Sequence, residues 1–187
     1  MNTVETVTQA AQPATQPASE TPQPMTPQEF LAELAPLAIA SAQVTGIPAG
    51  FVLAQGALES GWGNSALTRL ACNLFGVKAD ASWHGDTLAM ETEEVVDDRP
   101  VMVPALWRKY ANWSDCVNDH AQFFLQNSRY AAALTLRGDA VTDVSVAFTR
   151  AIAQAGYASD PGYANKVIAV IESDNLARYD APQTQPA

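Results

Sequence analysis

The amino-acid sequence predicts a mostly helical α+β domain that carries one β-hairpin. Two periodicities indicate this class: apolar residues recur every three or four positions near both ends of the chain, and between Thr87 and Tyr110 they alternate with their neighbours. Of the 187 residues, 48% are hydrophobic, which is sufficient for one full core. Stretches rich in Pro, Thr and Gln lie outside it, so we expect a flexible leader over 1–25, one globular domain over 26–180 and a flexible tail over 181–187.

The first two helices are predicted from their start and stop signals. A capping box with proline at the first helical position, TPQE at 26–29, opens the first helix, which we expect Pro36 to disturb. Pro48 starts the second helix, and the glycines of GWG at 61–63 end it. This second helix has an apolar face and carries Glu59 in its last turn.

The middle of the chain is predicted to form the hairpin, and the remainder returns to helices. Alternating residues over 87–110 flank a turn at DDRP, residues 97–100. Ser114 is then expected to cap a helix, another helix is expected over 143–155, and Asp160 with the proline after it is expected to cap the last one. The outline is a helical domain with one inserted hairpin.

Charge and hydropathy exclude two classes of partner. The chain has 10 Lys and Arg against 20 Asp and Glu, and its formal net charge of -10 repels a polyphosphate backbone, so no nucleic acid is expected to bind. No stretch has the roughly 20 apolar residues that a membrane-spanning helix requires, so no membrane span is expected. The N-terminal MNTVETVTQA lacks the basic and apolar regions of a signal peptide, so export would need another route.

The sequence predicts no metal site and no cofactor. Cys72 and Cys116 lack zinc-ligand spacing, and His84 and His120 lie apart with no HExxH pattern around them. Cys116 and His120 are four residues apart on one predicted helix, where we expect the thiol to pack rather than to react. The two cysteines are expected to be buried free thiols, with a single bridge between them as the alternative in an oxidising compartment.

Glu59 is the residue most informative about chemistry. It ends a helix that is otherwise apolar, and a carboxyl group near apolar surface has its ionised form disfavoured, so we expect its pKa to be raised. A carboxyl that stays protonated near neutral pH can donate a proton to a glycosidic oxygen. The alternative is a solvated helix end with no catalytic role.

Four collinear blocks carry a resemblance to a known family. They are ALESGWGNSAL at 57–67, NLFGVKA at 73–79, TEEV at 92–95 and AGYASDPGYANKV at 155–167. Together they resemble glycoside hydrolase family 73, over about 30–178. The resemblance implies a lysozyme-like fold with the β-hairpin flanking a cleft, cleavage after N-acetylglucosamine in peptidoglycan, and Glu59 as the general acid.

The resemblance also implies a second carboxylate on the hairpin. The family has a Thr-x-Glu-Tyr pattern there, which matches Thr92 and Glu94 but has Val95 in place of the tyrosine. Alternation places Glu93 and Glu94 on opposite faces, so only one of them can point into the cleft. Glu94 can serve as a nucleophile, activate water or orient a substrate whose own acetamido group attacks. The alternative is a solvated hairpin face.

Other residues in these blocks are candidates for the cleft. The resemblance places Tyr157 near the reacting sugar, where its phenol can bond the acetamido group or position water, and a core tyrosine is the alternative. Tyr163 is expected to pack on the last helix. Aromatic and polar residues expected at or near the substrate are Trp62 as support for the catalytic turn, Phe75 and Trp83 as cleft lining, and Asn73 as a turn former or a polar contact.

We therefore expect an endo-β-N-acetylglucosaminidase whose partner is the glycan strand of peptidoglycan and which works in the periplasm or cell wall. A lytic transglycosylase on the same scaffold is the alternative among enzymes, and a non-catalytic glycan-binding module is the alternative outside them. Flagellar, phage and secreted-effector settings remain open, with a flagellar rod or a secretion apparatus as the candidate protein partners.

Overall fold

The computed structural model describes residues 23–96, 99–136 and 143–181, without the side chains of 93–96. Most of the predicted leader and tail, the first two residues of the predicted turn at 97–100, and the side chain of Glu94 therefore lie outside the described residues. Within these ranges the order of elements is α1 (Pro27–Thr45), α2 (Ala49–Ser60), α3 (Ala66–Ala71), β1 (Thr87–Val96), β2 (Arg99–Arg108), α4 (Trp113–Gln126), η1 (Ser128–Tyr130), α5 (Ala131–Leu134), α6 (Val144–Gln154), α7 (Tyr163–Ser173) and η2 (Leu176–Tyr179).

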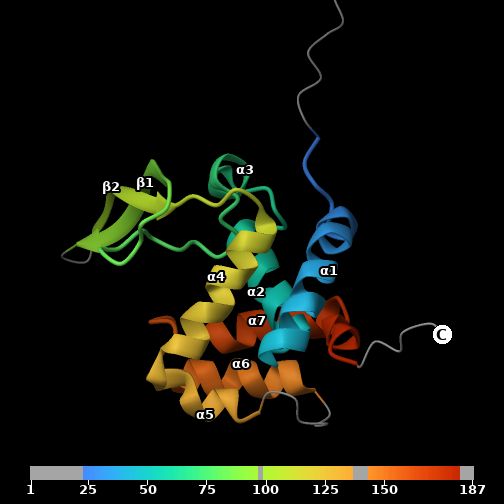
Figure 1. The fold of residues 1–187 in the computed structure, drawn as a ribbon. Coiled ribbons are helices and arrows are strands. Elements are labelled where there is room, and N and C mark those ends of the chain that lie inside the picture. Colours follow the sequence, from blue (N-terminus) through green and yellow to red (C-terminus); the bar gives the residue numbers. More distant parts are fainter. Residues whose placement is uncertain (1–22, 97–98, 137–142, 182–187) are drawn as a thin grey trace, which may run out of the picture.

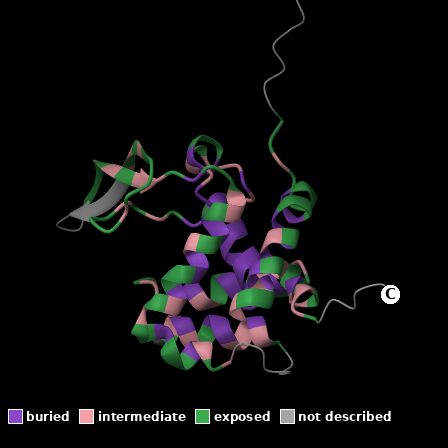
Figure 2. Ribbon diagram, in the orientation of Figure 1, coloured by how far each residue is buried: buried purple, intermediate pink, exposed green. Residues whose placement is uncertain are grey.

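Helix α2 lies at the centre of the helical body (Figure 1) and packs against α1, α6, α7 and η2. All of its residues from Ala49 to Ala57 are buried, and it is purple along most of its length in Figure 2. Close approach of its neighbours requires glycine at Gly50, because an added Cβ would lie 2.8 Å from the carbonyl oxygen of Leu176. The element that carries Glu59 is therefore held by four neighbouring elements.

Helix α1 begins as predicted but does not end where we expected a disturbance. Both halves of the capping box form: the Thr26 hydroxyl accepts from the Glu29 backbone, and the Glu29 carboxylate accepts from the Thr26 backbone. The expectation that Pro36 disturbs the helix was wrong, because α1 continues to Thr45. Pro36 is exposed while Leu34 and Ala38 are buried, so packing on one face stabilises the helix although a backbone donor is missing on the other.

The hairpin has the predicted antiparallel form and projects from one end of the helical body (Figure 1). Alternation holds on β1, where Leu88 and Met90 are half-buried while Ala89 and Glu91 are exposed. The ladder pairs Leu88 with Trp107, so the half-buried face of β1 continues on β2. One face of the hairpin is thereby turned toward protein, as a flanking element requires.

The later helices differ from prediction mainly at their caps. The N-cap of α4 is Asn112, whose side chain accepts from the backbone of Asp115, so the expected cap at Ser114 was wrong by two residues. Helix α6 runs over Val144–Gln154, as predicted. The expected cap at Asp160 was wrong, because the N-cap of α7 is Gly162 and no side chain caps this helix. Asp160 instead accepts from the backbone N–H of Gly162 at 2.7 Å and closes the turn immediately before α7.

Candidate active site

Glu59 is the next-to-last residue of α2 and is followed by an abrupt change of chain direction. Gly61, Trp62 and Gly63 all have left-handed backbone, with φ of 57°, 57° and 79°. The hydroxyl of Ser60 donates to the carbonyl of Gly56 and accepts from the N–H of Gly63 at 2.7 Å, which holds this turn from inside. The helix therefore stops directly after the carboxylate and leaves Glu59 at its C-terminal end.

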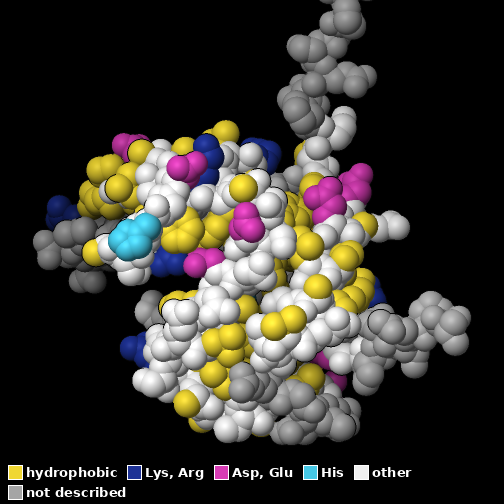
Figure 3. All heavy atoms as spheres, in the orientation of Figure 1, with side chains coloured by type: hydrophobic (Ala, Val, Ile, Leu, Met, Phe, Trp, Pro, Cys, Tyr) yellow, Lys and Arg dark blue, Asp and Glu magenta, His cyan; other side chains and the backbone are white. Residues whose placement is uncertain are grey.

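The carboxyl of Glu59 is open on one side and desolvated on the other. Its side chain is classed as exposed, yet the surrounding protein removes enough water to raise its pKa above the ordinary value. The hydroxyl of Tyr163 donates to Oε1 at 3.0 Å and opposes part of that rise. The C-terminal end of a helix also disfavours negative charge. Figure 3 shows the surface hollowed between the hairpin lobe and the helical lobe.

Tyr163 contacts Glu59 directly, which was not predicted from the sequence. It was expected only to pack on the last helix, and it is 8% exposed, but its hydroxyl lies between two polar partners. Gln55, one turn before Glu59 on α2, donates from Nε2 to this hydroxyl at 2.8 Å. Gln55 is 0% exposed within an apolar helix, and such a residue requires a buried partner. That requirement is the signal by which the contact could have been anticipated.

Tyr157 lies beside this group, in the segment between α6 and α7. Its ring is half-buried, stands 5.4 Å from the ring of Tyr163 and stacks on Phe124 at 5.5 Å. Burial raises the pKa of Tyr157, and the nearby Glu59 carboxylate raises it further, so the phenol keeps its proton. The structure thus brings Tyr157 and Tyr163, from one segment of the chain, together with Glu59 from another about 100 residues earlier.

Two candidates for substrate contact lie below the surface. Asn73 is 1% exposed, and its amide bonds the backbone of Val77 in both directions and the carbonyl of Arg108. Of the two roles expected for Asn73, the structure has the turn former. Phe75 is 5% exposed and stacks on His120 at 3.8 Å. Its expected place in the cleft lining is corrected, because the aromatic stack in the core covers its face.

The two tryptophans occupy different surroundings. Trp62 is half-buried and meets Phe30 of α1 edge-on at 5.6 Å, so it packs the turn after Glu59 onto the core. Trp83 is half-buried, and its Nε1 donates to the carbonyl of Asp86 at 2.9 Å. The guanidinium of Arg108 lies 4.9 Å from the centre of the Trp83 ring.

Glu94 is paired with Val101 in the ladder, and its side chain lies outside the described residues.

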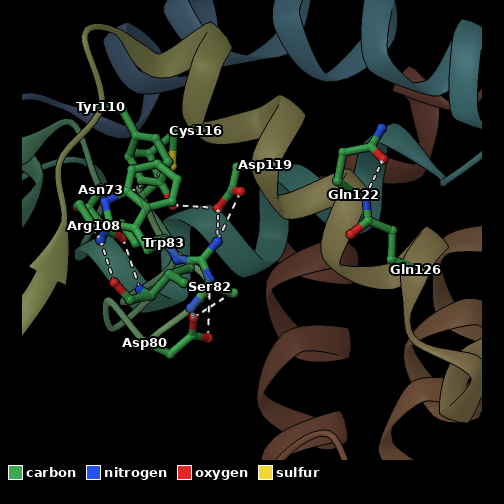
Figure 4. Close-up of polar contacts among 12 residues, drawn as sticks. Asn73, Asp80, Ser82, Trp83, Arg108, Tyr110, Cys116, Asp119, Gln122 and Gln126 are labelled. Carbon is green, nitrogen blue, oxygen red and sulfur yellow. Dashed lines mark hydrogen bonds and ion pairs between the residues drawn. The ribbon is translucent and has the colours of Figure 1, made fainter. Parts of the chain in front are cut away.

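A polar cluster joins the base of the hairpin to α4 (Figure 4). Arg108, the last residue of β2, donates through Nη1 to both oxygens of Asp119 at 3.0 and 2.9 Å, and its Nη2 lies 3.3 Å from Asp80. The hydroxyl of Tyr110 also donates to Asp119, at 2.7 Å. Both carboxylate oxygens of Asp119 thus accept hydrogen bonds, and those from the charged guanidinium are stronger than bonds between neutral groups. The hairpin base is therefore held on α4.

The remaining expectations concern thiols, metals and membranes. Cys72 and Cys116 are both free, and burial raises the pKa of the Cys116 thiol to about 12, so it is not a nucleophile near neutral pH. Among the side chains that the structure describes, which leave out Glu93 and Glu94, no three of His, Cys, Asp or Glu are grouped as a metal ion would need. Within 23–96, 99–136 and 143–181, no helix combines the length and apolarity of a membrane span.

Known proteins resemble this chain in both sequence and structure. A family model described as mannosyl-glycoprotein endo-beta-N-acetylglucosaminidase matches residues 35–176. The peptidoglycan hydrolase FlgJ of Vibrio parahaemolyticus is 42% identical over 147 residues, which are 77% of this chain and 46% of that protein. The exo-glucosaminidase LytG of Bacillus subtilis is 38% identical over 128 residues, which are 68% of this chain and 44% of that protein. The chain thus spans less than half the length of these two relatives.

Solved structures agree with the sequence matches. The truncated glycoside hydrolase domain of Salmonella typhimurium FlgJ superposes with a TM-score of 0.67 at 33% identity, covering 80% of this chain and 98% of that one. The catalytic domain of the autolysin Auto of Listeria monocytogenes superposes with a TM-score of 0.72 at 30% identity, covering 87% of this chain and 92% of that one. The described fold is the lysozyme-like fold that the four sequence blocks implied.

Proposed function

The chain belongs to the glucosaminidase family of glycoside hydrolases, and from this premise we propose that it hydrolyses the β-1,4 bond after N-acetylglucosamine in peptidoglycan. The observation that carries the proposal is the carboxyl of Glu59, open on one side at the end of a buried helix and with a raised pKa. A protonated carboxyl in such a place can donate to the leaving oxygen as the glycosidic bond breaks.

Three further residues are our candidates for the remaining steps of the proposed reaction. The phenol of Tyr157 stays protonated and can donate a hydrogen bond to the acetamido group of the sugar or to the attacking water. Glu94 is our candidate on the hairpin for stabilising the oxocarbenium-like transition state or for accepting a proton from the attacking water. In the alternative route, the acetamido group of the substrate attacks in place of water. Trp83 is our candidate for stacking on a sugar ring.

The decisive experiment replaces Glu59 with Gln. We expect Glu59→Gln to keep its far-ultraviolet circular dichroism and thermal unfolding, and to lose at least about 100-fold in release of soluble fragments from purified peptidoglycan. Glu172→Gln is the matched control, because it makes the same change of charge at an exposed position on α7. Undiminished release by Glu59→Gln would refute the assignment of the acid.

Product analysis identifies the reaction and the mode of attack. Hydrolysis leaves a reducing N-acetylglucosamine end that contains one added water, whereas a lytic transglycosylase leaves an anhydro end and adds none. Mass spectrometry of the digest distinguishes them. Internal cleavage produces long fragments at first, whereas the exo mode named for LytG of Bacillus subtilis would release small units from chain ends. We propose the internal mode and a site of action in the periplasm or cell wall.

The protein partner belongs to the same proposal. Several relatives carry the name FlgJ, and we propose a flagellar rod or a secretion apparatus as the structure that delivers the enzyme to the wall. Co-purification of the chain with either assembly from the producing cells would test this, and recovery with neither would contradict it.

A further inference from the structure

Three hydrogen bonds connect the buried interior to the carboxyl of Glu59. His120 Nε2 lies 2.7 Å from Gln55 Oε1, Gln55 Nε2 donates to the hydroxyl of Tyr163 at 2.8 Å, and Tyr163 donates to Glu59 Oε1 at 3.0 Å. Helices α4, α2 and α7 each contribute to the chain of bonds, which we call the relay. Among the described residues, Oε2 of Glu59 has no hydrogen-bond partner.

The position of the ring proton on His120 determines which atom donates in each hydrogen bond of the relay. The ring is 3% exposed, and burial lowers the pKa of His120 to about 3, so near neutral pH it carries one ring proton. Nδ1 is buried and has no partner among the described residues. A proton on Nδ1 would be an unpaired buried donor, which costs more than an unpaired acceptor, so the proton belongs on Nε2 and is donated to Gln55.

Each later bond in the relay is then determined. Because Oε1 of Gln55 accepts from His120, the amide nitrogen faces Tyr163 and donates to its oxygen. The proton of the Tyr163 hydroxyl is thereby left for Glu59. The first members are also immobile, since the ring of His120 stacks on Phe75 at 3.8 Å and Gln55 is 0% exposed.

We propose that Gln55 and His120 are positioning residues that hold the Tyr163 hydroxyl as a donor to Oε1 of Glu59 and so keep the transferable proton on Oε2. This inference depends on the proposed role of Glu59 as general acid. The groups that face Glu59 are Tyr163 on α7 and Tyr157 in the segment before it, with Gln55 behind them on α2 itself. No salt bridge between described residues includes Glu59.

The test is the pH dependence of kcat and KM on soluble peptidoglycan strands. Activity falls on the alkaline side as Glu59 loses its proton, and the Tyr163 donor stabilises the ionised carboxylate. Tyr163→Phe removes this donor, so we expect the alkaline limb to move to higher pH and kcat to fall by about 10-fold, with KM nearly unchanged. Gln55→Met is expected to move the limb in the same direction by a smaller amount.

A double variant and a control separate positioning from mere packing. If Gln55 acts through Tyr163, the double variant Gln55→Met with Tyr163→Phe should move the limb no further than Tyr163→Phe alone. Thr149→Val is the matched control, because it removes a buried hydroxyl that bonds only its own helix at Ser145. We expect it to leave the pH profile and kcat unchanged.

His120→Phe tests the far end of the relay if Gln55→Met fails to fold. It keeps an aromatic ring beside Phe75 and removes the donor to Gln55, so the alkaline limb should again move upward. The relay would be overturned if the alkaline limb of the pH profile stayed in place in the folded variants, or if the shifts of that limb in the two single variants added up in the double variant. These outcomes are distinct from failure of the proposed function, which would appear as activity retained by Glu59→Gln.

Discussion

Acid should destabilise this protein through His120. Burial lowers the pKa of His120 to about 3 in the folded chain, whereas an exposed histidine in the unfolded chain titrates near 6.5. The unfolded chain therefore binds a proton that the folded chain does not. The contribution of the neutral, buried His120 to the free energy of unfolding is thus fully present above about pH 6.5 and is lost as the pH falls toward 3. The loss is at most about 1.4 kcal/mol per pH unit, or about 3 kcal/mol between pH 7 and pH 4.

Urea unfolding of the wild type and of His120→Phe, from about pH 7 to about pH 4, measures this contribution. Phe keeps an aromatic ring in the stack with Phe75 but cannot titrate. Carboxyl groups titrate in both proteins, so the difference between the two free energies of unfolding isolates His120. We expect the wild type to lose about 3 kcal/mol more than the variant over this range. Parallel curves would refute the argument, because they would mean that His120 is protonated as readily in the folded state.

Three further substitutions test the packing around the site. Gly63→Ala should lower the free energy of unfolding by about 2 kcal/mol, because φ is 79° and the new Cβ would lie 3.0 Å from the sulfur of Met25; an unchanged urea midpoint would contradict this. Asn73→Ala should cost about 3 kcal/mol, since it removes three hydrogen bonds of a buried amide, and thermal unfolding would detect the loss. Cys116→Ala should keep fragment release largely intact, and a large loss would indicate that the thiol takes part in the reaction.

The elements of the fold that were predictable are those whose signals are local. The capping box at Thr26 needs only four consecutive residues, and the alternation of the hairpin needs only neighbouring positions. The effect of Pro36 was misjudged because the backbone hydrogen bond that it removes is a local loss, whereas the packing that stabilises α1 comes from distant elements. Helices α3 and α5 have 6 and 4 residues, which is too short for a helical period to be recognised.

The surroundings of Glu59 were predictable because they depend on one residue and its flanks. Glu59 was expected from an apolar helix that ends in glycines, and its raised pKa follows from that placement. The partner hydroxyl was not expected, because Tyr163 fits the apolar face of α7 and only the tertiary arrangement shows where its oxygen lies. Phe75 was misplaced for the converse reason, since nothing local distinguishes a ring in the core from a ring in a cleft.

Helix α4 connects the two halves of the candidate site through consecutive residues. Successive side chains on a helix point about 100° apart, so Asp119 faces Arg108 at the hairpin base while His120 faces Gln55 in the core. One rigid helix thereby fixes both the hairpin and the first donor of the relay.

This arrangement predicts that the two functions of α4 can be separated. Asp119→Asn removes the charge-assisted hydrogen bonds from Arg108 Nη1, so the free energy of unfolding should fall by about 2 kcal/mol and KM should rise, because the hairpin is held less firmly on α4. The alkaline limb of the pH profile should not move, since the relay to Glu59 does not include Asp119. A limb that moved in Asp119→Asn as far as in His120→Phe would mean that α4 shifts as a whole, and the hairpin and the acid would then be coupled rather than independently positioned.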